Sequence, residues 1–154
     1  MKEKIKIIAE IANAHQGSSL NAFKLAHASA KAGADAIKFQ IYFADELLVK
    51  KHKRFNHFKK QAFSHKQWDI LLTKSKKLKR EIYADIFGTK AYKLASKHNL
   101  DGYKIHSSDL NNLPLLELVA KDDKKIFLAI GGSTITEIYN ALEFINKIST
   151  KREI

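Results

Sequence analysis

Two lysines stand in the middle of short apolar runs, where a charged side chain is unusual. Lys38 lies in the sequence Ile-Lys-Phe, and Lys104 lies in the sequence Tyr-Lys-Ile. In an extended strand the side chains alternate between two faces, so each lysine points away from its large apolar neighbours. A buried ammonium group needs an anion, and a substrate phosphate or carboxylate would serve, as would Glu10 when no ligand is bound. The pattern predicts a pocket for a small dianion, and the alternative is a pair of surface lysines on edge strands.

Polar and acidic residues follow the same apolar runs. Glu10 comes directly after the run 5–9, His15 lies in the loop beyond it, and Ser107 and Asp109 follow the run 102–106. Burying a carboxylate at the tip of an apolar strand costs free energy unless the carboxylate has a partner or a task. Glu10 is therefore a candidate for chemistry, with the bracing of a loop or helix end as the alternative. A single loop histidine is more typical of a structural hydrogen bond, so His15 carries less weight.

Apolar runs rich in Ile, Phe and Tyr alternate with longer segments of helical periodicity. This alternation is typical of parallel α/β proteins. The segment 40–65 is basic, aromatic and too long for an ordinary connection, so we expect it to cover one end of the sheet. We expect strands at 5–9, 34–39, 81–85, 102–106 and 125–130, and helices at 19–32, 68–78, 90–98, 112–121 and from the capping-box sequence Thr134–Glu137 onward.

Five βα units with no shift in composition between them predict a single α/β domain. A complete TIM barrel needs eight such units in about 250 residues. The chain is therefore a partial (β/α)8 barrel with parallel strands or an open, doubly wound five-stranded sheet, and periodicity alone does not decide between them. Both folds place their chemistry at the carboxyl ends of the strands.

The composition excludes several classes of protein and of chemistry. The 154 residues are 45% hydrophobic, which predicts a folded domain, and they contain no cysteine for a disulfide or a thiolate nucleophile. No apolar run approaches the roughly 18–20 residues of a membrane-spanning helix, and the first residues have no signal-peptide profile. We therefore expect a cytoplasmic protein without a membrane partner.

The charge balance suggests an anionic partner. There are 28 Lys and Arg against 16 Asp and Glu, for a net charge of +12. Almost all of the excess is lysine, whereas recognition of nucleic acid bases favours arginine. A lysine-rich solvated surface, compatible with small anionic substrates, is thus favoured over a nucleic acid partner. The segment 50–60 interleaves bases with aromatic residues and keeps single-stranded nucleic acid as an alternative, which would bind with a steep salt dependence.

Several stretches together resemble the sialic acid synthase (N-acetylneuraminate synthase) family. They are Ile7–Ile11, His15–Gly17, Ala32–Gln40, Tyr103–Ile105 with Ser107 and Asp109, and Asn112–Glu117, and they lie in register over nearly the whole chain. The resemblance implies a TIM barrel that condenses phosphoenolpyruvate with an N-acylated amino sugar, such as N-acetylmannosamine, to a nonulosonic acid. It also implies a divalent metal (Mn or Mg), an antifreeze-like domain after the barrel, and a homodimer.

Carried over residue by residue, the resemblance assigns roles to the strand-end residues. Lys38, Lys104 and Ser107 become ligands of phosphoenolpyruvate, and Glu10 and Asp109 become catalytic groups that face the sugar and the condensing carbons. The implied reaction is attack of C3 of phosphoenolpyruvate on the metal-polarised aldehyde of the open-chain sugar, followed by water addition and loss of phosphate.

The chain departs from the family pattern in three stretches of sequence. Ala14 replaces an asparagine, Asp85 stands at the threonine of a Ser-Thr-Pro-Phe run, and Ala129 replaces a serine. We still expect Asp85 and His15 at the substrate site. A negative charge on Asp85 should weaken phosphoenolpyruvate binding unless a lysine or a metal offsets it.

The resemblance also predicts how the chain relates to a complete barrel. We expect residues 1–154 to be the N-terminal portion of one synthase-like TIM-barrel domain, with the later barrel units, their two metal-binding histidines and the antifreeze-like domain absent. Catalysis would then need the missing units. The alternative is a non-catalytic fragment of the same fold that binds an anion or a sugar.

Overall fold

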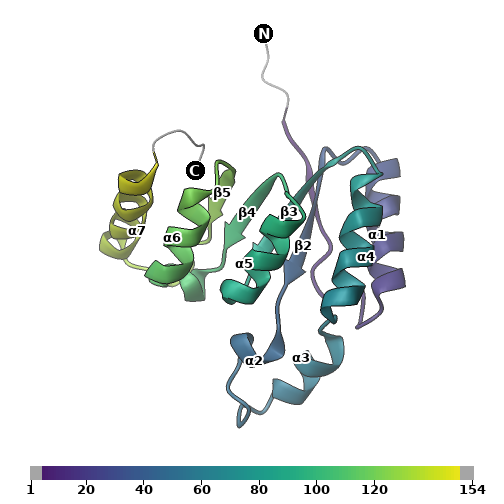
Figure 1. Ribbon diagram of the computed structural model, residues 1–154, viewed down its shortest axis with the longest axis horizontal. Coiled ribbons are helices and arrows are strands. Elements are labelled where there is room, and N and C mark those ends of the chain that lie inside the picture. The colour runs from purple at the N-terminus through teal and green to yellow at the C-terminus, as the bar shows by residue number, and fades with distance from the viewer. Residues whose placement is uncertain (1–4, 150–154) are drawn as a thin grey trace.

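A single parallel sheet organises the chain. The computed structural model describes residues 5–149 (Figure 1). The strands are β1 (Ile8–Glu10), β2 (Ala36–Ile41), β3 (Glu81–Ile86), β4 (Gly102–Ile105) and β5 (Lys125–Leu128), and they lie side by side in their sequence order. Because connections between neighbouring parallel strands are almost always right-handed, this order places the connecting helices on one face. A doubly wound sheet reverses its strand order and covers both faces. The fold is therefore a partial TIM barrel, and the doubly wound alternative is wrong.

The helices begin at residues suited to cap them. Ser64 and Thr134 each form a capping box, Ser18 and Asn112 accept backbone N–H groups, and Pro114 occupies the first turn of its helix. None of the helices within residues 5–149 is long and apolar enough to cross a membrane. The helices are α1 (Ser19–Lys31), α2 (Ala44–Leu47), α3 (Phe55–Gln61), α4 (His65–Lys76), α5 (Gly88–Lys97), α6 (Leu113–Lys121) and α7 (Ile135–Ile148), with a short 3-10 helix, η1, at Ser107–Asp109.

The hydrophobic core fills the space between the sheet and its helices. Ile37, Phe39 and Ile41 of β2 are buried there against residues such as Trp68 and Leu72 of α4. Because neighbouring residues of a strand point to opposite faces, the residues between them turn to the face without helices. In a complete barrel that face is the interior, so the alternation separates the packing residues from those available for chemistry.

Two expected strands begin later than the sequence predicts. The first strand, expected at 5–9, covers only Ile8–Glu10, because β2 begins at Ala36 opposite Ile8 and the residues before Ile8 have no strand to pair with. The second, expected at 34–39, begins at Ala36. The preceding turn follows Gly33, whose φ of +95° is strained for other residues, and it is tied to the end of α1 by the hydrogen bond from the Ala34 N–H to the Ser29 carbonyl.

The fifth strand and the segment 40–65 also differ from expectation. The strand expected at 125–130 ends at Leu128, because its last ladder bond is donated by the Ala129 N–H to the Ile105 carbonyl and β4 goes no further. The segment expected to be irregular contains the end of β2 and the two short helices α2 and α3. Figure 1 shows both helices at one end of the sheet, as predicted.

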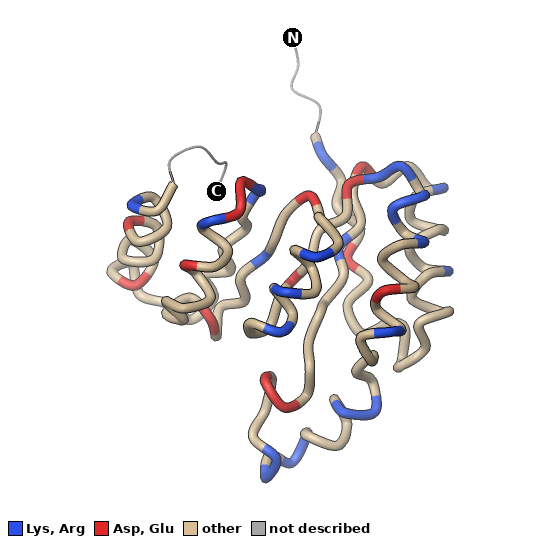
Figure 2. The backbone as a smooth tube through the Cα atoms, viewed as in Figure 1, with Lys and Arg blue, Asp and Glu red and all other residues tan. Residues whose placement is uncertain are grey.

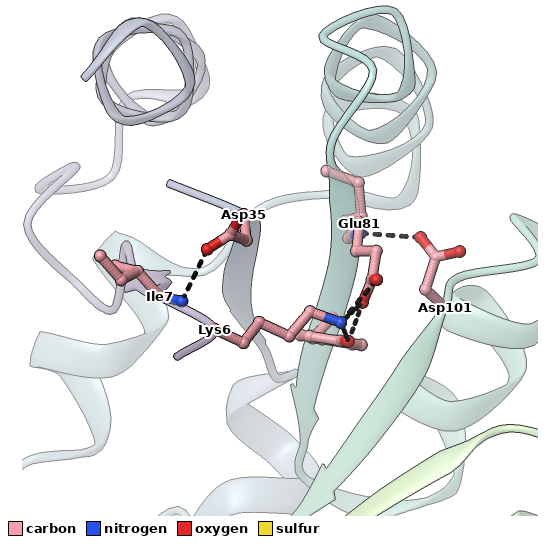
Figure 3. A network of polar contacts seen from close by, with 7 residues as sticks. Lys6, Ile7, Asp35, Glu81 and Asp101 are labelled. Carbon is pink, nitrogen blue, oxygen red and sulfur yellow. Dashed lines mark hydrogen bonds and ion pairs between the residues drawn. The ribbon is translucent and has the colours of Figure 1, made fainter. Parts of the chain in front are cut away.

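A polar network secures the opposite, amino-terminal end of the strands (Figure 3). The Lys6 ammonium lies 2.5 Å from the Glu81 carboxylate and 3.0 Å from the Tyr83 hydroxyl, and these hydrogen bonds hold the pKa of Lys6 well above its usual range. The Asp35 and Asp101 carboxylates accept the backbone N–H groups of Ile7 and Ile82. Contacts at the amino-terminal ends of barrel strands contribute to stability, whereas the chemistry is expected at the carboxyl-terminal ends.

Candidate functional site

The register of the sheet joins the predicted lysines to carboxylates on the face without helices. Glu10 lies opposite Lys38, with 2.8 Å between Oε2 and Nζ. One row closer to the carboxyl ends, Asp85 lies opposite Lys104, with 2.5 Å between Oδ2 and Nζ. The expectation that Glu10 would pair with Lys38 in the absence of a ligand is confirmed. The site thus contains two neighbouring ion pairs, each linking adjacent strands.

The two ion pairs differ in their exposure to solvent. The Lys38 side chain is 17% exposed and that of Glu10 is 36% exposed. A pair so open to water contributes only about 0–1 kcal/mol, so a ligand anion could replace Glu10 at little cost. The second pair is less accessible, since the Asp85 side chain is completely buried and that of Lys104 is 23% exposed.

Asp85 is the most perturbed carboxylate of the site. Burial raises its pKa, and the hydrogen bond from Lys104 opposes that rise. Its Oδ2 accepts the Lys104 bond, while its Oδ1 is buried without a hydrogen-bond partner among the described residues. Asp85 therefore holds Lys104 but is itself incompletely satisfied, which suits a group that changes partners when a ligand binds.

The other predicted site residues form contacts within their own loops. Ser107 begins η1, and Asp109 accepts a hydrogen bond of 2.9 Å from the side chain of Asn112, the N-cap of α6. His15 is buried, its Nδ1 accepts the Gly17 N–H at 3.0 Å, and its ring packs against Phe63 at 4.4 Å. These contacts are those of a loop brace. The substrate-binding and catalytic roles of the three residues stay predictions.

A cavity of about 500 Å³ opens at the carboxyl ends of β2, β3 and β4. Its floor includes Gln40, which lies opposite Asp85 in the sheet, so the cavity adjoins the second ion pair. Six of the lining residues lie between positions 42 and 58 of the segment 40–65. The lining residues are Asn13, Gln40, Tyr42, Leu47, Leu48, His52, Arg54, Phe58, Phe87 and His106.

Sequence reasoning missed Arg54, His52 and His106 in this cavity. Nothing in the spacing of the three residues predicts that they meet. The one available signal is the length of the segment 40–65 directly after a strand end. Figure 2 shows blue Lys and Arg segments gathered in this part of the chain. A second cavity of about 570 Å³ lies between α2 and α3, but no strand-end residue lines it.

The described residues do not form a metal site by themselves. Within residues 5–149, no three His, Asp or Glu side chains come together as ligands of one ion. Glu10 and Asp85 are engaged with lysines instead. The divalent metal stays an expectation from the resemblance.

Comparisons with known proteins assign the chain to a family. Residues 25–154 match the model of the NeuB family. The chain is 30% identical over 165 residues to N,N'-diacetyllegionaminic acid synthase of Campylobacter jejuni, covering 98% of this chain and 49% of that protein. It is 28% identical over 156 residues to N-acetylneuraminate-9-phosphate synthase of Mus musculus, covering 91% and 44%.

Solved structures agree with the fold. The crystal structure of N-acetylneuraminic acid synthetase from Leptospira borgpetersenii matches with a TM-score of 0.89 and 27% identity, over 97% of this chain and 53% of that one. The chain thus spans about half the length of these relatives.

Proposed function

Because the chain belongs to the NeuB family, we propose that it takes part in the condensation of phosphoenolpyruvate with an N-acylated amino sugar to a nonulosonic acid. Relatives named as legionaminic acid and N-acetylneuraminate phosphate synthases support this class of reaction. The observation that carries the proposal is the placement of Lys38 and Lys104 on the open face of the sheet, near the strand ends. Two ammonium groups there suit the phosphate and the carboxylate of phosphoenolpyruvate.

The proposed reaction uses the strand-end residues as follows. C3 of phosphoenolpyruvate forms a bond to the aldehyde carbon of the open-chain sugar, and the aldehyde oxygen takes a proton. Water adds to C2 of the former phosphoenolpyruvate, and phosphate leaves as the ketone forms. Lys38 and Lys104 hold the donor anion, while Glu10 and Asp109 exchange protons with the sugar oxygen and the water. No step is assigned to a metal, because the described residues offer no three-ligand site.

One observation favours a second candidate, binding of an anion or sugar without turnover. Asp85 neutralises Lys104 directly, so a phosphoenolpyruvate anion must displace a buried carboxylate before it reaches that lysine. The displaced carboxylate would have to take up a proton or move, and either change weakens binding. This candidate uses the same residues and differs only in the absence of product.

A titration with phosphoenolpyruvate tests both candidates. We expect Lys38→Gln and Lys104→Gln each to weaken binding at least tenfold in calorimetry, whereas Lys60→Gln, which removes an equal charge from an exposed position, should leave binding unchanged. Adding N-acetylmannosamine should then release inorganic phosphate if the chain catalyses the condensation. Lysine-dependent binding without phosphate release would favour the second candidate.

The opposite pattern would overturn both candidates. In that pattern, phosphoenolpyruvate binding would be unchanged in the Lys38 and Lys104 variants. Oligonucleotide binding would weaken steeply with salt and with the removal of charges from the segment 50–60. These results would indicate a nucleic acid partner.

A further inference from the structure

The polar lining of the cavity at the strand ends contains hydrogen-bond donors but no carboxylate. None of its ten lining residues is acidic, and five of them, Asn13, Gln40, His52, Arg54 and His106, carry side-chain N–H groups. The two acids of α2, Asp45 and Glu46, contact Lys90 near the start of α5 instead. The Arg54 guanidinium is therefore not neutralised by these two acids, whereas Lys38 and Lys104 each have a carboxylate partner.

The two histidines present donors because their other ring nitrogen is occupied. His52 Nδ1 accepts the backbone N–H of Arg54 at 3.1 Å, and His106 Nδ1 accepts the backbone N–H of Ser108 at 3.4 Å. A neutral histidine that accepts through Nδ1 carries its proton on Nε2. Both of these lining rings therefore carry their N–H donor on Nε2.

Asn13 and Arg54 extend the same pattern. The Oδ1 atom of Asn13 accepts the Tyr42 hydroxyl at 3.2 Å, which leaves the Asn13 amide NH₂ as the free end of the side chain. The Arg54 guanidinium lies over the Phe58 ring at 4.9 Å and forms no ion pair with a carboxylate of the described residues. A planar guanidinium beside three further donors is suited to a phosphate group.

An aromatic wall completes the cavity. The ring of Tyr42 meets those of Phe58 and Phe87 edge-on at 5.7 and 6.4 Å, and burial raises the pKa of Tyr42 to about 12, so its hydroxyl stays protonated. Aromatic faces accommodate the C–H surfaces of a sugar, and about 500 Å³ is within the range of small-molecule sites.

From this lining we propose that the cavity binds an amino sugar that carries a phosphate monoester, with Arg54 as the main phosphate ligand and His52, His106 and Asn13 as additional donors. The inference rests on the proposed function and names the substrate class of the same site. Phosphoenolpyruvate adds three carbons to the aldehyde end, so C6 of the sugar becomes C9 of the product. A sugar 6-phosphate would therefore give a 9-phosphate, the product named for the Mus musculus relative.

Calorimetric titrations of the full chain test this specificity. The probes are N-acetylmannosamine 6-phosphate, N-acetylmannosamine, inorganic phosphate and phosphoenolpyruvate. We expect the sugar phosphate to bind at least tenfold more tightly than the unphosphorylated sugar. Arg54→Gln should abolish that preference, whereas Lys53→Gln, which removes the same charge from the adjacent exposed position outside the cavity, should retain it.

Phosphoenolpyruvate binding distinguishes a failure of this inference from a failure of the proposed function. Its affinity should be unchanged in Arg54→Gln, provided that the variant keeps the wild-type circular dichroism spectrum, and should fall in Lys104→Gln. Equal affinities for the two sugars in the wild-type chain, or loss of phosphoenolpyruvate binding in Arg54→Gln, would overturn the inference and leave the proposed function standing. Failure to bind either sugar or phosphoenolpyruvate would overturn both.

Discussion

Removing Lys104 should destabilise the protein in a way that depends on pH. In Lys104→Met the carboxylate of Asp85, which is completely buried, loses the partner of its Oδ2, while its Oδ1 has none among the described residues. Breaking a buried ion pair by removing one partner costs about 3–5 kcal/mol. The Lys104 side chain is 23% exposed, which reduces the expected cost to about 2–4 kcal/mol at pH 7.

The protonation of Asp85 sets an upper limit on this cost. Its ordinary pKa is 3.8, so taking up a proton at pH 7 costs about 4 kcal/mol, and at pH 4.5 only about 1 kcal/mol. In the variant the opposing hydrogen bond from Lys104 is gone, and burial, the largest cause of the shift, keeps the folded pKa of Asp85 above the unfolded value. The folded state then holds a proton that the unfolded state releases, so the stability of the variant falls as pH rises from about 3.8 through the folded pKa.

Denaturant unfolding at pH 7 and pH 4.5 measures the effect. We expect the free energy of unfolding of Lys104→Met to fall short of wild type by about 2–4 kcal/mol at pH 7 and by about 1 kcal/mol at pH 4.5. The double variant Lys104→Met/Asp85→Asn should recover most of the loss at pH 7, because the buried charge is gone. An equal loss at both pH values, or a double variant as unstable as the single one, would refute the reasoning.

Three further changes probe the fold. Gly102→Ala would place a Cβ 2.7 Å from the Lys125 carbonyl oxygen and should cost about 1–3 kcal/mol in denaturant unfolding, whereas Gly131→Ala, with nothing within 4 Å, should be neutral; equal effects would contradict the packing argument. Burial lowers the pKa of His15, so wild type should lose stability as pH falls through 6.5 and His15→Asn should lose less, as unfolding at pH 7.5 and 5.5 would reveal. Thr134→Ala removes the N-cap acceptor of α7 and should cost about 1 kcal/mol, with faster amide exchange in the first turn of that helix; unchanged exchange would argue against a capping role.

Local patterns predicted the elements better than their ends. The strand expected at 81–85 and the capping box at Thr134 depend on nearest neighbours in the chain, and both are found where expected, with β3 one residue longer. The ends of the first and fifth strands depend instead on how far the adjacent strand extends. That information lies in another part of the sequence, so apolar runs alone overestimate the length of these strands.

The site shows the same division between local and long-range information. Alternation predicted that Lys38 and Lys104 leave the core face, and the sheet confirms it. The pairing of Lys104 with Asp85 joins residues 19 positions apart and follows only from the register of β3 and β4. The cavity residues Arg54 and His106 are further separated still, in segments without periodicity, so no pattern in the sequence could bring them together.

The two ion pairs suggest how the partly buried Lys38 and Lys104 are stabilised before an anionic ligand binds. A lysine without an anion is costly on a face that a complete barrel would enclose, and Glu10 and Asp85 supply that anion inside the chain. The Glu10 pair is partly solvated, so an entering dianion can exchange with it at small cost. The Asp85 pair is buried, and the raised pKa of Asp85 favours its release as a neutral acid. An anion should therefore engage Lys38 before Lys104, and binding at the second lysine should be accompanied by proton uptake.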